Sequence, residues 1–428
     1  MKLSNSISLL RRAEKVIPSC SQTFSKGPDQ WVGNVSPHYL TRGDGAWVWD
    51  VDDNRYLDWM MALGPVILGY NNRRVNDAIQ RQLQDGPTFS MMHPLEVEVS
   101  ELLVEHIPCA EMVRFAKTGS DALTAAVRLA RYVTGREHVA MCSYHGWHDW
   151  HIGTTTRDGG VPESVKALSH TFEFNDLQSL KQVFAEQPGK IAAVVMEPIV
   201  GDPPAQGYLA AARELIHAEG AILVFDEIVS GFRFGLGGGQ EYLGIEPDLA
   251  CFGKGMANGM PLSAVTGRRD LMEKFDDIFF SSTFGGETLS LAAAKATIEE
   301  IRDTDALQSI RENGQALIDG LLDLINRHGL GEAIGVAGTN VRSGLRFPNA
   351  DREEMRLRRS FLMQECVKRG LLYFTNHLPS AAHRSAEVDF TLDVLDQSLA
   401  QFAVAHQNDD FMERMEGDVV AEIFRTRT

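Results

Sequence analysis

Lys254 lies in the segment CFGKGMANGMP (251–261), between two glycines and with no other charged side chain in the segment. Lysines usually keep the ammonium group in water, so three interpretations compete: a phosphate-binding lysine, an ordinary surface loop and a nucleophilic amine. A phosphate-binding P-loop has GxxxxGK followed by Ser or Thr. Asp248 and Gly255 stand at the positions that need Gly and Ser or Thr. The pattern argues against a P-loop and leaves the surface loop and the nucleophile open.

The segment FAKTGSDALTAA (115–126) has the residue types of an anion site at the start of a helix. Thr118, Gly119 and Ser120 supply hydroxyl and backbone N–H groups where the helix dipole is positive. The alternative is that Thr118 or Ser120 only caps the helix. The two roles are compatible, so the segment predicts a phosphate site without excluding a plain cap.

Asp226 and Glu227 follow an apolar run in AILVFDEIVSGFR (221–233), which predicts a buried strand with carboxylates at its end. A buried carboxylate is costly unless it is paired, and a salt bridge or a helix cap would be the ordinary solution. Asp226 precedes Lys254 by 28 residues, which is about the length of one strand–helix–strand unit. We therefore expect these two side chains at the ends of nearby strands.

The segment SYHGWHDWHIGTT (143–155) combines aromatic side chains with three histidines. His145, His148 and His151 could suggest a metal site, but they do not match the HExxH pattern. The competing interpretation is that an aromatic side chain such as Tyr144 stacks on a planar ring at the end of a strand. Ordinary packing accounts for the tryptophans.

Together, a phosphate cup, an aromatic platform, an aspartate and a lysine are the groups that pyridoxal 5′-phosphate (PLP) requires. A lysine forms the Schiff base, and an acidic partner holds the pyridine nitrogen protonated. Lys254 and Asp226 fit these two roles. The contact between the aspartate and the ring would be a charge-assisted hydrogen bond of about 1.5–3 kcal/mol, which would offset the burial of the carboxylate.

Between about residues 113 and 265, short apolar runs alternate with amphipathic helical patterns. The expected strands are 113–116, 138–142, 192–196, 221–226 and 249–253, and the expected helices include 121–133 and 176–187. Such alternation predicts an α/β fold with a mostly parallel sheet flanked by helices. Ligands of such sheets bind outside the carboxyl ends of the strands, and the segments described above fall there.

The remaining segments predict a smaller α+β domain built from both termini. We expect residues 1–60 to join this small domain, 61–320 to form the large PLP-binding domain, and 321–428 to complete the small one. The C-terminal part combines the strand-like runs VRSGLRF and GLLYF with a helix that has one apolar face, formed by Leu392, Leu395, Leu399 and Phe402. The acidic stretch NDDFMERMEGDVV is expected to be a surface helix.

The bulk composition limits the partners. The 428-residue chain carries a formal net charge of −17, which argues against a nucleic-acid partner. Its five cysteines are scattered and form no CxxC pair, as is usual in a reducing compartment. The N-terminus lacks the apolar stretch of a signal peptide, and no apolar run approaches the length of a membrane span. We expect a cytoplasmic enzyme with no membrane segment.

In order along the chain, these segments resemble those of the class III, fold-type I, PLP-dependent aminotransferases, and most of all the glutamate-1-semialdehyde 2,1-aminomutase group. The resemblance begins near residue 35 and includes GAWVWDVDDNRYLDW, GPVILGY, TGSDALTAAVRLAR, YHGWHD, DEIVSGFR, FGKGMANGMPLSAVTGR and STFGG. It implies that Lys254 forms the Schiff base and moves the proton, that Asp226 pairs with the pyridine nitrogen, and that the enzyme is a homodimer with shared active sites. The cofactor-binding residues that it implies are Thr118, Gly119, Ser120, Tyr144, Asp226, Ile228, Lys254 and Thr283, and Thr283 would reach the phosphate of the neighbouring subunit.

The resemblance is weaker around the substrate. The aminomutases have a VNSPVR-like segment whose arginine helps to hold the substrate carboxylate, whereas SCSQTFSKG (19–27) has no arginine. Leu63 stands where they have tryptophan, and Gly285–Thr288 (GGET) replaces SGNP. Arg42, Arg233 and Arg384 remain alternatives for the donor carboxylate, and Glu197 lies in a matching string without an assigned role.

Residues 113–131, 144–155 and 157–162 resemble a sugar-aminotransferase branch of lipopolysaccharide pathways, which includes 8-amino-3,8-dideoxy-manno-octulosonate transaminase. We therefore expect transfer of an amino group from an amino acid, such as L-glutamate, to a carbonyl sugar or sugar acid. The C8 aldehyde of 3,8-dideoxy-8-oxo-manno-octulosonate is one such acceptor. The alternatives are an intramolecular aminomutase, a metal-dependent hydrolase built on the histidines, and a non-catalytic relative.

Overall fold

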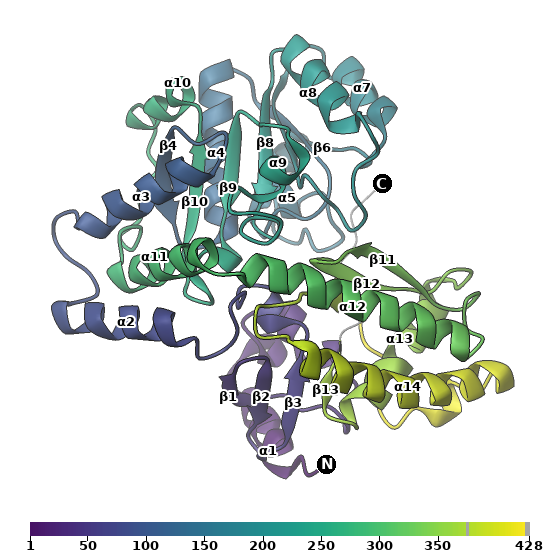
Figure 1. Cartoon of the computed structure of the whole chain (residues 1–428). Coiled ribbons are helices and arrows are strands. Elements are labelled where there is room, and N and C mark those ends of the chain that lie inside the picture. The colour runs from purple at the N-terminus through teal and green to yellow at the C-terminus, as the bar shows by residue number, and fades with distance from the viewer. Residues whose placement is uncertain (374–375, 424–428) are drawn as a thin grey trace. The chain divides into compact units, whose positions relative to one another are not determined.

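The computed structural model describes residues 1–373 and 376–423 and divides into two compact units (Figure 1). The terminal unit comprises Met1–Leu63, Ile67–Asn72 and Gln308–Ile423. The central unit comprises Gly64–Val66 and Arg73–Leu307. All the residues expected to bind the cofactor lie in the central unit.

The central unit is built on a seven-stranded sheet with the order β4-β10-β9-β8-β7-β5-β6. Its strands are β4 (Met112–Ala116), β5 (His138–Met141), β6 (Ser169–Thr171), β7 (Ile191–Met196), β8 (Ile222–Glu227), β9 (Leu249–Phe252) and β10 (Ser263–Gly267). Strand β10 runs antiparallel to both of its neighbours, and the other pairs are parallel. The predicted α/β fold with a mostly parallel sheet is confirmed, and β6 and β10 are the strands that the sequence patterns missed.

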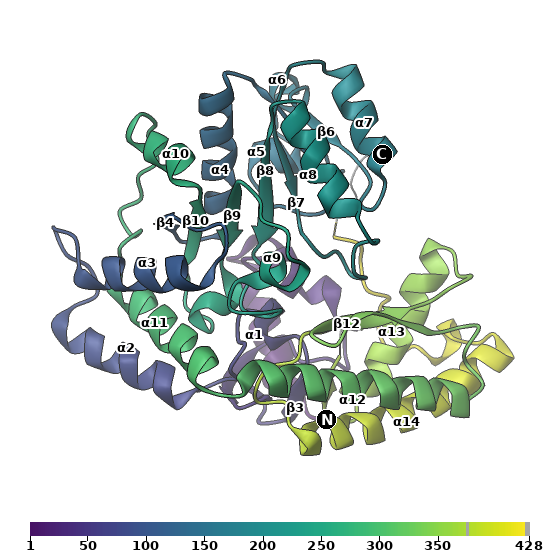
Figure 2. The same ribbon diagram turned by 45° about the horizontal axis from the view of Figure 1, so that its top comes forward.

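Helices cover both faces of this sheet (Figure 2). Right-handed crossovers place the helix after β4 on one face and the helices after β6 and β7 on the other. The helices of the unit are α2 (Arg73–Asp85), α3 (Pro94–His106), α4 (Gly119–Thr134), α5 (Asp149–Ile152), α6 (Glu163–Lys166), α7 (Leu177–Glu186), α8 (Tyr208–Ala218), α9 (Gly238–Leu243), α10 (Arg269–Met272) and α11 (Thr288–Asp303). Small alanines on α4, including Ala122, Ala126 and Ala130, bury that helix against the strands. The start of α4 is thereby fixed at the carboxyl edge of β4.

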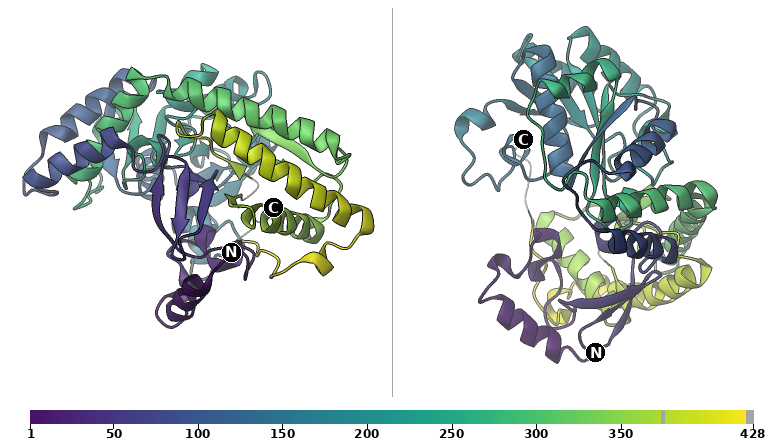
Figure 3. Two further views of the ribbon diagram at one scale, coloured as in Figure 1. Left: turned by 60° about the horizontal axis from the view of Figure 1, so that its bottom comes forward. Right: turned by 90° about the vertical axis from the view of Figure 1, so that its left-hand side faces the viewer.

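The terminal unit joins the two ends of the chain in one sheet with the order β1-β2-β3-β13. Its strands and helices are α1 (Ser4–Ala13), β1 (Leu40–Asp44), β2 (Trp47–Asp50), β3 (Arg55–Asp58), α12 (Ala306–Arg327, within the unit from Gln308), β11 (Gly335–Thr339), β12 (Arg342–Arg346), α13 (Arg352–Val367), β13 (Leu371–Leu372), β14 (Asn376–His377) and α14 (Ser385–Asn408). Helices α12 and α14 lie side by side (Figure 3). The predicted strand GLLYF contributes β13, and its Phe374 falls outside the described residues.

The core of the terminal unit confirms the predicted apolar face of α14. Leu395, Leu399 and Phe402 have no exposed surface, and Leu392 packs against the same cluster. The expected surface helix in the acidic stretch is wrong, because α14 ends at Asn408 and only the short 3-10 turn Met412–Arg414 follows. Phe411 is 4% exposed, so burial of an apolar side chain competes with a continuous exposed helix.

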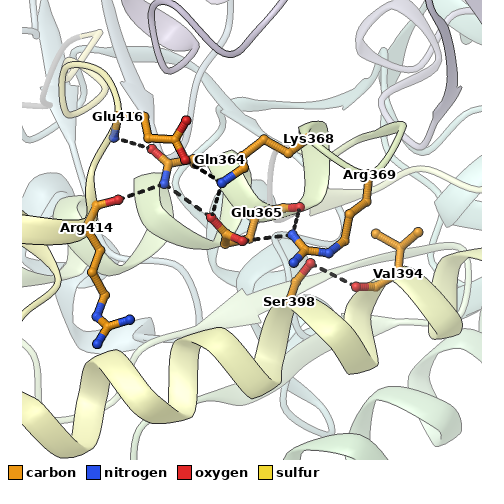
Figure 4. A network of polar contacts seen from close by, with 8 residues as sticks. All are labelled: Gln364, Glu365, Lys368, Arg369, Val394, Ser398, Arg414 and Glu416. Carbon is orange, nitrogen blue, oxygen red and sulfur yellow. Dashed lines mark hydrogen bonds and ion pairs between the residues drawn. The ribbon is translucent and has the colours of Figure 1, made fainter. Parts of the chain in front are cut away.

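Polar contacts hold the chain after α14 against α13 (Figure 4). The side chain of Gln364 donates to the carbonyl of Arg414 at 3.0 Å and accepts the N–H of Glu416 at 2.7 Å. Glu365 accepts from Arg369 at 2.8 Å. A glutamine that satisfies backbone groups on both sides of a bend can fix an irregular segment as firmly as a helix would. Among the described helices, none is long and apolar enough to cross a membrane.

Candidate active site

Two adjacent parallel strands bring Asp226 and Lys254 to one edge of the central sheet. Asp226 is in register with Cys251 of β9, and the chain reaches Lys254 three residues after that position. Lys254 has φ of 40°, in the left-handed region that costs an ordinary residue about 1–2 kcal/mol. It then begins the 3-10 helix Lys254–Ala257. Such strain is concentrated at functional sites, where the surroundings hold the backbone in place.

Asp226 is 4% exposed and makes two hydrogen bonds within the site. Its Oδ1 accepts the N–H of Ile228 at 3.0 Å, and its Oδ2 lies 2.8 Å from Nδ1 of His145. Nε2 of His145 lies 2.6 Å from the carbonyl oxygen of Cys142. A carbonyl oxygen can only accept, so Nε2 carries a hydrogen. The contact with Asp226 then requires a second proton between His145 and the carboxylate, so the pair is neutral as a whole.

Glu227 points away from Asp226, as the alternation of side chains along a strand requires. It has no exposed surface, and it accepts hydrogen bonds from the backbone N–H groups of Gly239 and Gln240, each at 2.8 Å. Burial raises the pKa of Glu227 to about 7, against the opposing hydrogen bond from Ser230. This carboxylate anchors the start of α9, and only Asp226 faces His145.

The three histidines of the loop after β5 have three different sets of contacts. His151 accepts the backbone N–H of His145 at 3.2 Å, and burial lowers its pKa to about 3, so its ring is neutral. His148 lies 2.7 Å from the hydroxyl of Thr124. Among the described residues, no three His, Cys, Asp or Glu side chains form a group that could hold a metal. The geometry gives no support to the hydrolase hypothesis, which needs the three rings to converge.

Tyr144 is 49% exposed and meets the ring of His151 edge-on, with ring centroids 5.3 Å apart. Partial burial, followed by the negative charge of Asp226, raises the pKa of the Tyr144 hydroxyl. The phenol therefore stays protonated. Tyr144 is thus a partly exposed, neutral phenol next to His145 in the chain.

Thr118 begins α4 with a reciprocal cap. Its side chain accepts the N–H of Asp121 at 3.2 Å and donates to the Asp121 carboxylate at 2.8 Å. The capping interpretation is thus confirmed for this hydroxyl. The first N–H groups of a helix have no partner within the helix, so the backbone of Gly119 and Ser120 offers donors to an anion. The Oγ of Ser120 accepts the N–H of Trp147 at 3.2 Å and joins the aromatic loop to this turn.

Glycines allow these segments to approach one another closely. A Cβ at Gly119 would lie 2.9 Å from Cδ1 of Ile228, and one at Gly253 would lie 3.1 Å from the same atom. A Cβ at Gly146 would lie 2.1 Å from Oγ of Ser120. Ile228 thus lies close to both the turn that begins α4 and the segment before Lys254. The first turn of α4, the loop that carries Tyr144 and the segments of Asp226, Ile228 and Lys254 therefore approach one another at the carboxyl edge of the sheet. Their donors, aromatic ring, carboxylate and amine are of the types that PLP binding requires.

Thr283 is placed apart from the other predicted residues. It is exposed in the loop that precedes α11, and in the described part of the chain no hydrogen bond joins it to the turn at Thr118–Ser120.

Arg233, a candidate for the donor carboxylate, is 1% exposed and donates to the carbonyl of Gly64 at 3.1 Å. In the terminal unit, the Arg42 guanidinium lies 4.2 Å above the ring of Trp49, and Arg384 begins α14.

Two interactions could not be read from the sequence. His145 belonged to a suspected metal cluster and instead bonds Asp226, 81 residues away. Lys117, next to the phosphate turn, forms an ion pair with Glu287 at 2.9 Å. The only hint in the sequence was that Glu287 lies in the GGET segment that departs from the related enzymes.

Residues 29–377 match the family model of Aminotransferase class-III. The chain belongs to the class III aminotransferases. It is therefore a PLP-dependent transaminase of fold type I, and the predictions of family, fold, enzyme class and cofactor are confirmed. Members of this family provide both sequence and structural comparisons.

Two curated relatives are similar over most of the chain. The 3-aminobutyryl-CoA aminotransferase of Cloacimonas acidaminovorans is 38% identical over 74% of this chain and 77% of its own length. A glutamate-1-semialdehyde 2,1-aminomutase of Aquifex aeolicus is 35% identical over 71% of this chain and 76% of its own length. The predicted likeness to the aminomutase group is thus confirmed, and a transaminase acting on a different substrate is similar to the same degree.

Solved structures agree with this assignment. The FumI protein of Sphingopyxis sp. MTA144, in its PLP internal aldimine form, superposes with a TM-score of 0.89 at 30% identity and covers 97% of this chain and 99% of its own. A glutamate-1-semialdehyde aminomutase variant of Pseudomonas aeruginosa PAO1 in complex with PMP has a TM-score of 0.83 at 25% identity, with 94% and 95% covered.

Proposed function

We propose that the central unit is the PLP-binding domain of this transaminase and that the cradle at the carboxyl edge of β8 and β9 is its active site. The observation that carries the proposal is the adjacency of β8, with Asp226 next to its last residue, and β9, which ends two residues before Lys254. We assign the cofactor to eight residues: Thr118, Gly119, Ser120, Tyr144, Asp226, Ile228, Lys254 and, from the neighbouring subunit, Thr283.

Lys254 is the proposed base and the covalent anchor. Bound PLP supplies an electron-accepting ring that stabilises the charge left when a proton leaves the substrate carbon. The Lys254 amine would take up that proton and release it again, as the acid–base group of the site. The left-handed backbone at Lys254 sets the direction in which its side chain leaves the main chain.

Asp226 and His145 act as a pair in this proposal. The carboxylate faces the cradle, and His145 lies behind it between Asp226 and the Cys142 carbonyl. The proton shared between His145 and Asp226 offsets the burial of the carboxylate, because the pair carries no net charge. With PLP bound, Asp226 would accept a hydrogen bond from the pyridine nitrogen, which would strengthen the electron demand of the ring.

The phosphate would lie at the start of α4. The N–H groups of Gly119 and Ser120 and the positive end of the helix dipole favour an anion there. Thr118 contributes by fixing the first turn, because its hydroxyl is engaged with Asp121. Tyr144 and Ile228 then supply the two faces between which the ring is held.

We propose a homodimer formed through the face that carries Thr283. Large apolar side chains are exposed on two loops there: Phe89 at 46%, Met91 at 75%, Met92 at 80%, Phe279 at 81% and Phe284 at 57%. The two loops are joined, because Thr288 donates through its N–H to the Pro87 carbonyl at 2.9 Å. An apolar patch of this kind is typical of a protein interface, and a second copy would bring Thr283 to the partner's phosphate.

For the overall reaction, we propose that L-glutamate donates the amino group and that a carbonyl sugar or sugar acid accepts it. The acceptor that the sequence favours is the C8 aldehyde of 3,8-dideoxy-8-oxo-manno-octulosonate. The support is the resemblance of the segments around Tyr144 and Thr118 to sugar aminotransferases, together with the loss of the tryptophan at Leu63. The two curated relatives support different substrates, a 3-aminoacyl thioester and glutamate 1-semialdehyde.

A panel of acceptors distinguishes these candidates. Enzyme converted to its amino form with L-glutamate would be mixed separately with an aldehyde sugar acid, a 3-oxoacyl thioester and glutamate 1-semialdehyde. We expect the sugar acid to restore the original absorbance fastest. Faster recovery with the thioester would replace our acceptor. Conversion of glutamate 1-semialdehyde without any external donor would instead establish the aminomutase.

A further inference from the structure

The loop that carries Thr283 is held by cations from the two elements that build the phosphate turn. On its N-terminal side, the Arg114 guanidinium of β4 donates to the Phe280 carbonyl at 2.5 Å. From α4, Arg128 donates to the Phe279 carbonyl at 2.8 Å. Phe279 and Phe280 immediately precede the exposed run that contains Thr283.

A third cation holds the C-terminal side of the same loop. Lys117, between β4 and α4, lies 2.9 Å from the Glu287 carboxylate, and the two side chains are only 18% and 15% exposed. Glu287 also accepts the N–H of Leu289 at 2.7 Å and thereby caps α11. Burial works to raise the pKa of Glu287, but the hydrogen bonds from Ser290, Lys117 and Leu289 outweigh it and lower that pKa. The carboxylate is therefore ionised and paired at neutral pH.

The backbone between these supports has little freedom. The N–H of Gly285 donates to the Ser282 carbonyl at 3.0 Å, which closes a turn around Thr283. A Cβ at Gly285 would lie 3.4 Å from the Phe115 carbonyl oxygen of β4. The turn is thus packed against the strand that leads into the phosphate-binding segment, while Thr283 itself faces outward.

We propose that Arg114, Lys117 and Arg128 are positioning residues that hold Thr283 in the geometry needed at the neighbouring subunit's PLP phosphate. The inference rests on the proposed cross-subunit role of Thr283. It goes beyond that role, because it assigns the placement of Thr283 to three cationic side chains of the same subunit that supplies the threonine. None of the three touches the partner's cofactor, and each acts through the loop.

The test measures the rate at which PLP dissociates from the holoenzyme after dilution, followed by its protein-bound absorbance. Arg128→Met removes the donor but keeps most of the side-chain stem, and Glu287→Gln removes the ion pair at nearly constant shape. We expect each to raise the dissociation rate by about five- to tenfold. Arg128→Lys should recover part of the loss. Arg131→Met is the matched control, because Arg131 lies on the same helix and donates to the Glu137 carbonyl instead.

A double variant separates positioning from general weakening. If Arg128 acts through Thr283, then Arg128→Met should add little to the effect of Thr283→Ala. If the double variant instead loses PLP at a rate raised by the product of the two single effects, the proposal is contradicted. An unchanged dissociation rate in Thr283→Ala would overturn the cross-subunit role itself. A faster rate in Thr283→Ala with normal rates in Arg128→Met and Glu287→Gln would overturn only the further inference.

Hybrid dimers show which site the cations serve. One subunit carries Lys254→Ala and cannot bond PLP covalently, so the absorbance of the lysine-bonded cofactor reports the other subunit. Arg128→Met placed in the Lys254→Ala chain should accelerate PLP loss from its partner. The same substitution placed in the lysine-bearing chain should leave that rate unchanged. The reverse pattern would show that Arg128 acts within its own site and would contradict the proposal.

Discussion

His145 and Asp226 are joined by a 2.8 Å contact between Nδ1 and Oδ2, and the other nitrogen of His145 bonds the Cys142 carbonyl at 2.6 Å. Both ring nitrogens of His145 face oxygen acceptors. The pair must therefore hold one proton more than a neutral histidine and a carboxylate hold together. Both side chains are nearly fully buried. The pair therefore places a carboxylate at the strand end without leaving a net charge in the core.

Replacement of His145 should affect chemistry more than cofactor binding. His145→Ala leaves the buried Asp226 without its hydrogen-bond partner, at a cost of about 1–3 kcal/mol. We expect the rate of the half-reaction with the amino donor to fall by about ten- to a hundredfold, while PLP occupancy changes little. Stopped-flow absorbance measures the rate. An equal loss in His148→Ala would contradict a specific role, because His148 contacts Thr124 instead.

Asp226→Asn should leave the protein folded and severely reduce proton abstraction. The amide keeps the shape and can still accept from the Ile228 N–H, but it loses the charge that holds a proton on the ring nitrogen. We expect the rate to fall by about a hundredfold or more. Asp248→Asn is the control for loss of a carboxylate elsewhere in the unit, because Asp248 lies at the opposite end of β9 and pairs with Arg268. Unchanged half-reaction rates in Asp226→Asn would refute its role.

The glycine cradle predicts a pair of compensating substitutions. Gly119→Ala puts a Cβ 2.9 Å from Ile228, and such overpacking costs about 1–3 kcal/mol. We expect weaker PLP binding in Gly119→Ala and partial recovery when Ile228→Val is added. Equilibrium dialysis measures both. Gly159→Ala is the control, because a Cβ there meets nothing within 4 Å; a similar loss in that variant would contradict the packing argument.

His151 should make the enzyme sensitive to acid. Burial lowers its pKa to about 3, against about 6.5 in the unfolded chain. The unfolded state therefore binds the extra proton first, so the stability from this group is complete above pH 6.5 and is lost as the pH falls toward 3. In that window the contribution of His151 to the free energy of unfolding falls by about 1.4 kcal/mol for each pH unit of acidification. Urea unfolding at several pH values should show a shallower dependence in His151→Gln, and an unchanged slope would contradict this assignment.

Periodicity placed Asp226 and Lys254 near the ends of adjacent strands, as the structure has them, and the limits of the sequence patterns have physical causes. The apolar run before Asp226 and the glycines around Lys254 are local features, so their positions at strand ends followed from the alternation of strands and helices. Strand β10, SAVTG, contains small residues with no periodic signal, although all five positions are buried. The partner of Asp226 depends on a contact across 81 residues. In the tail, burial of Phe411 outweighed a local pattern that favoured a helix.

The central claim is that Lys254 anchors PLP at the edge of β8 and β9 and that an external amino acid converts the cofactor. Visible absorption spectra of the purified enzyme, before and after addition of L-glutamate, test it most directly, with Lys254→Ala alongside. We predict that the wild-type protein is yellow and bleaches with glutamate, and that Lys254→Ala, reconstituted with PLP, shows neither the lysine-bonded absorbance nor turnover. A Lys254→Ala protein that keeps the wild-type spectrum and bleaches normally would contradict the account.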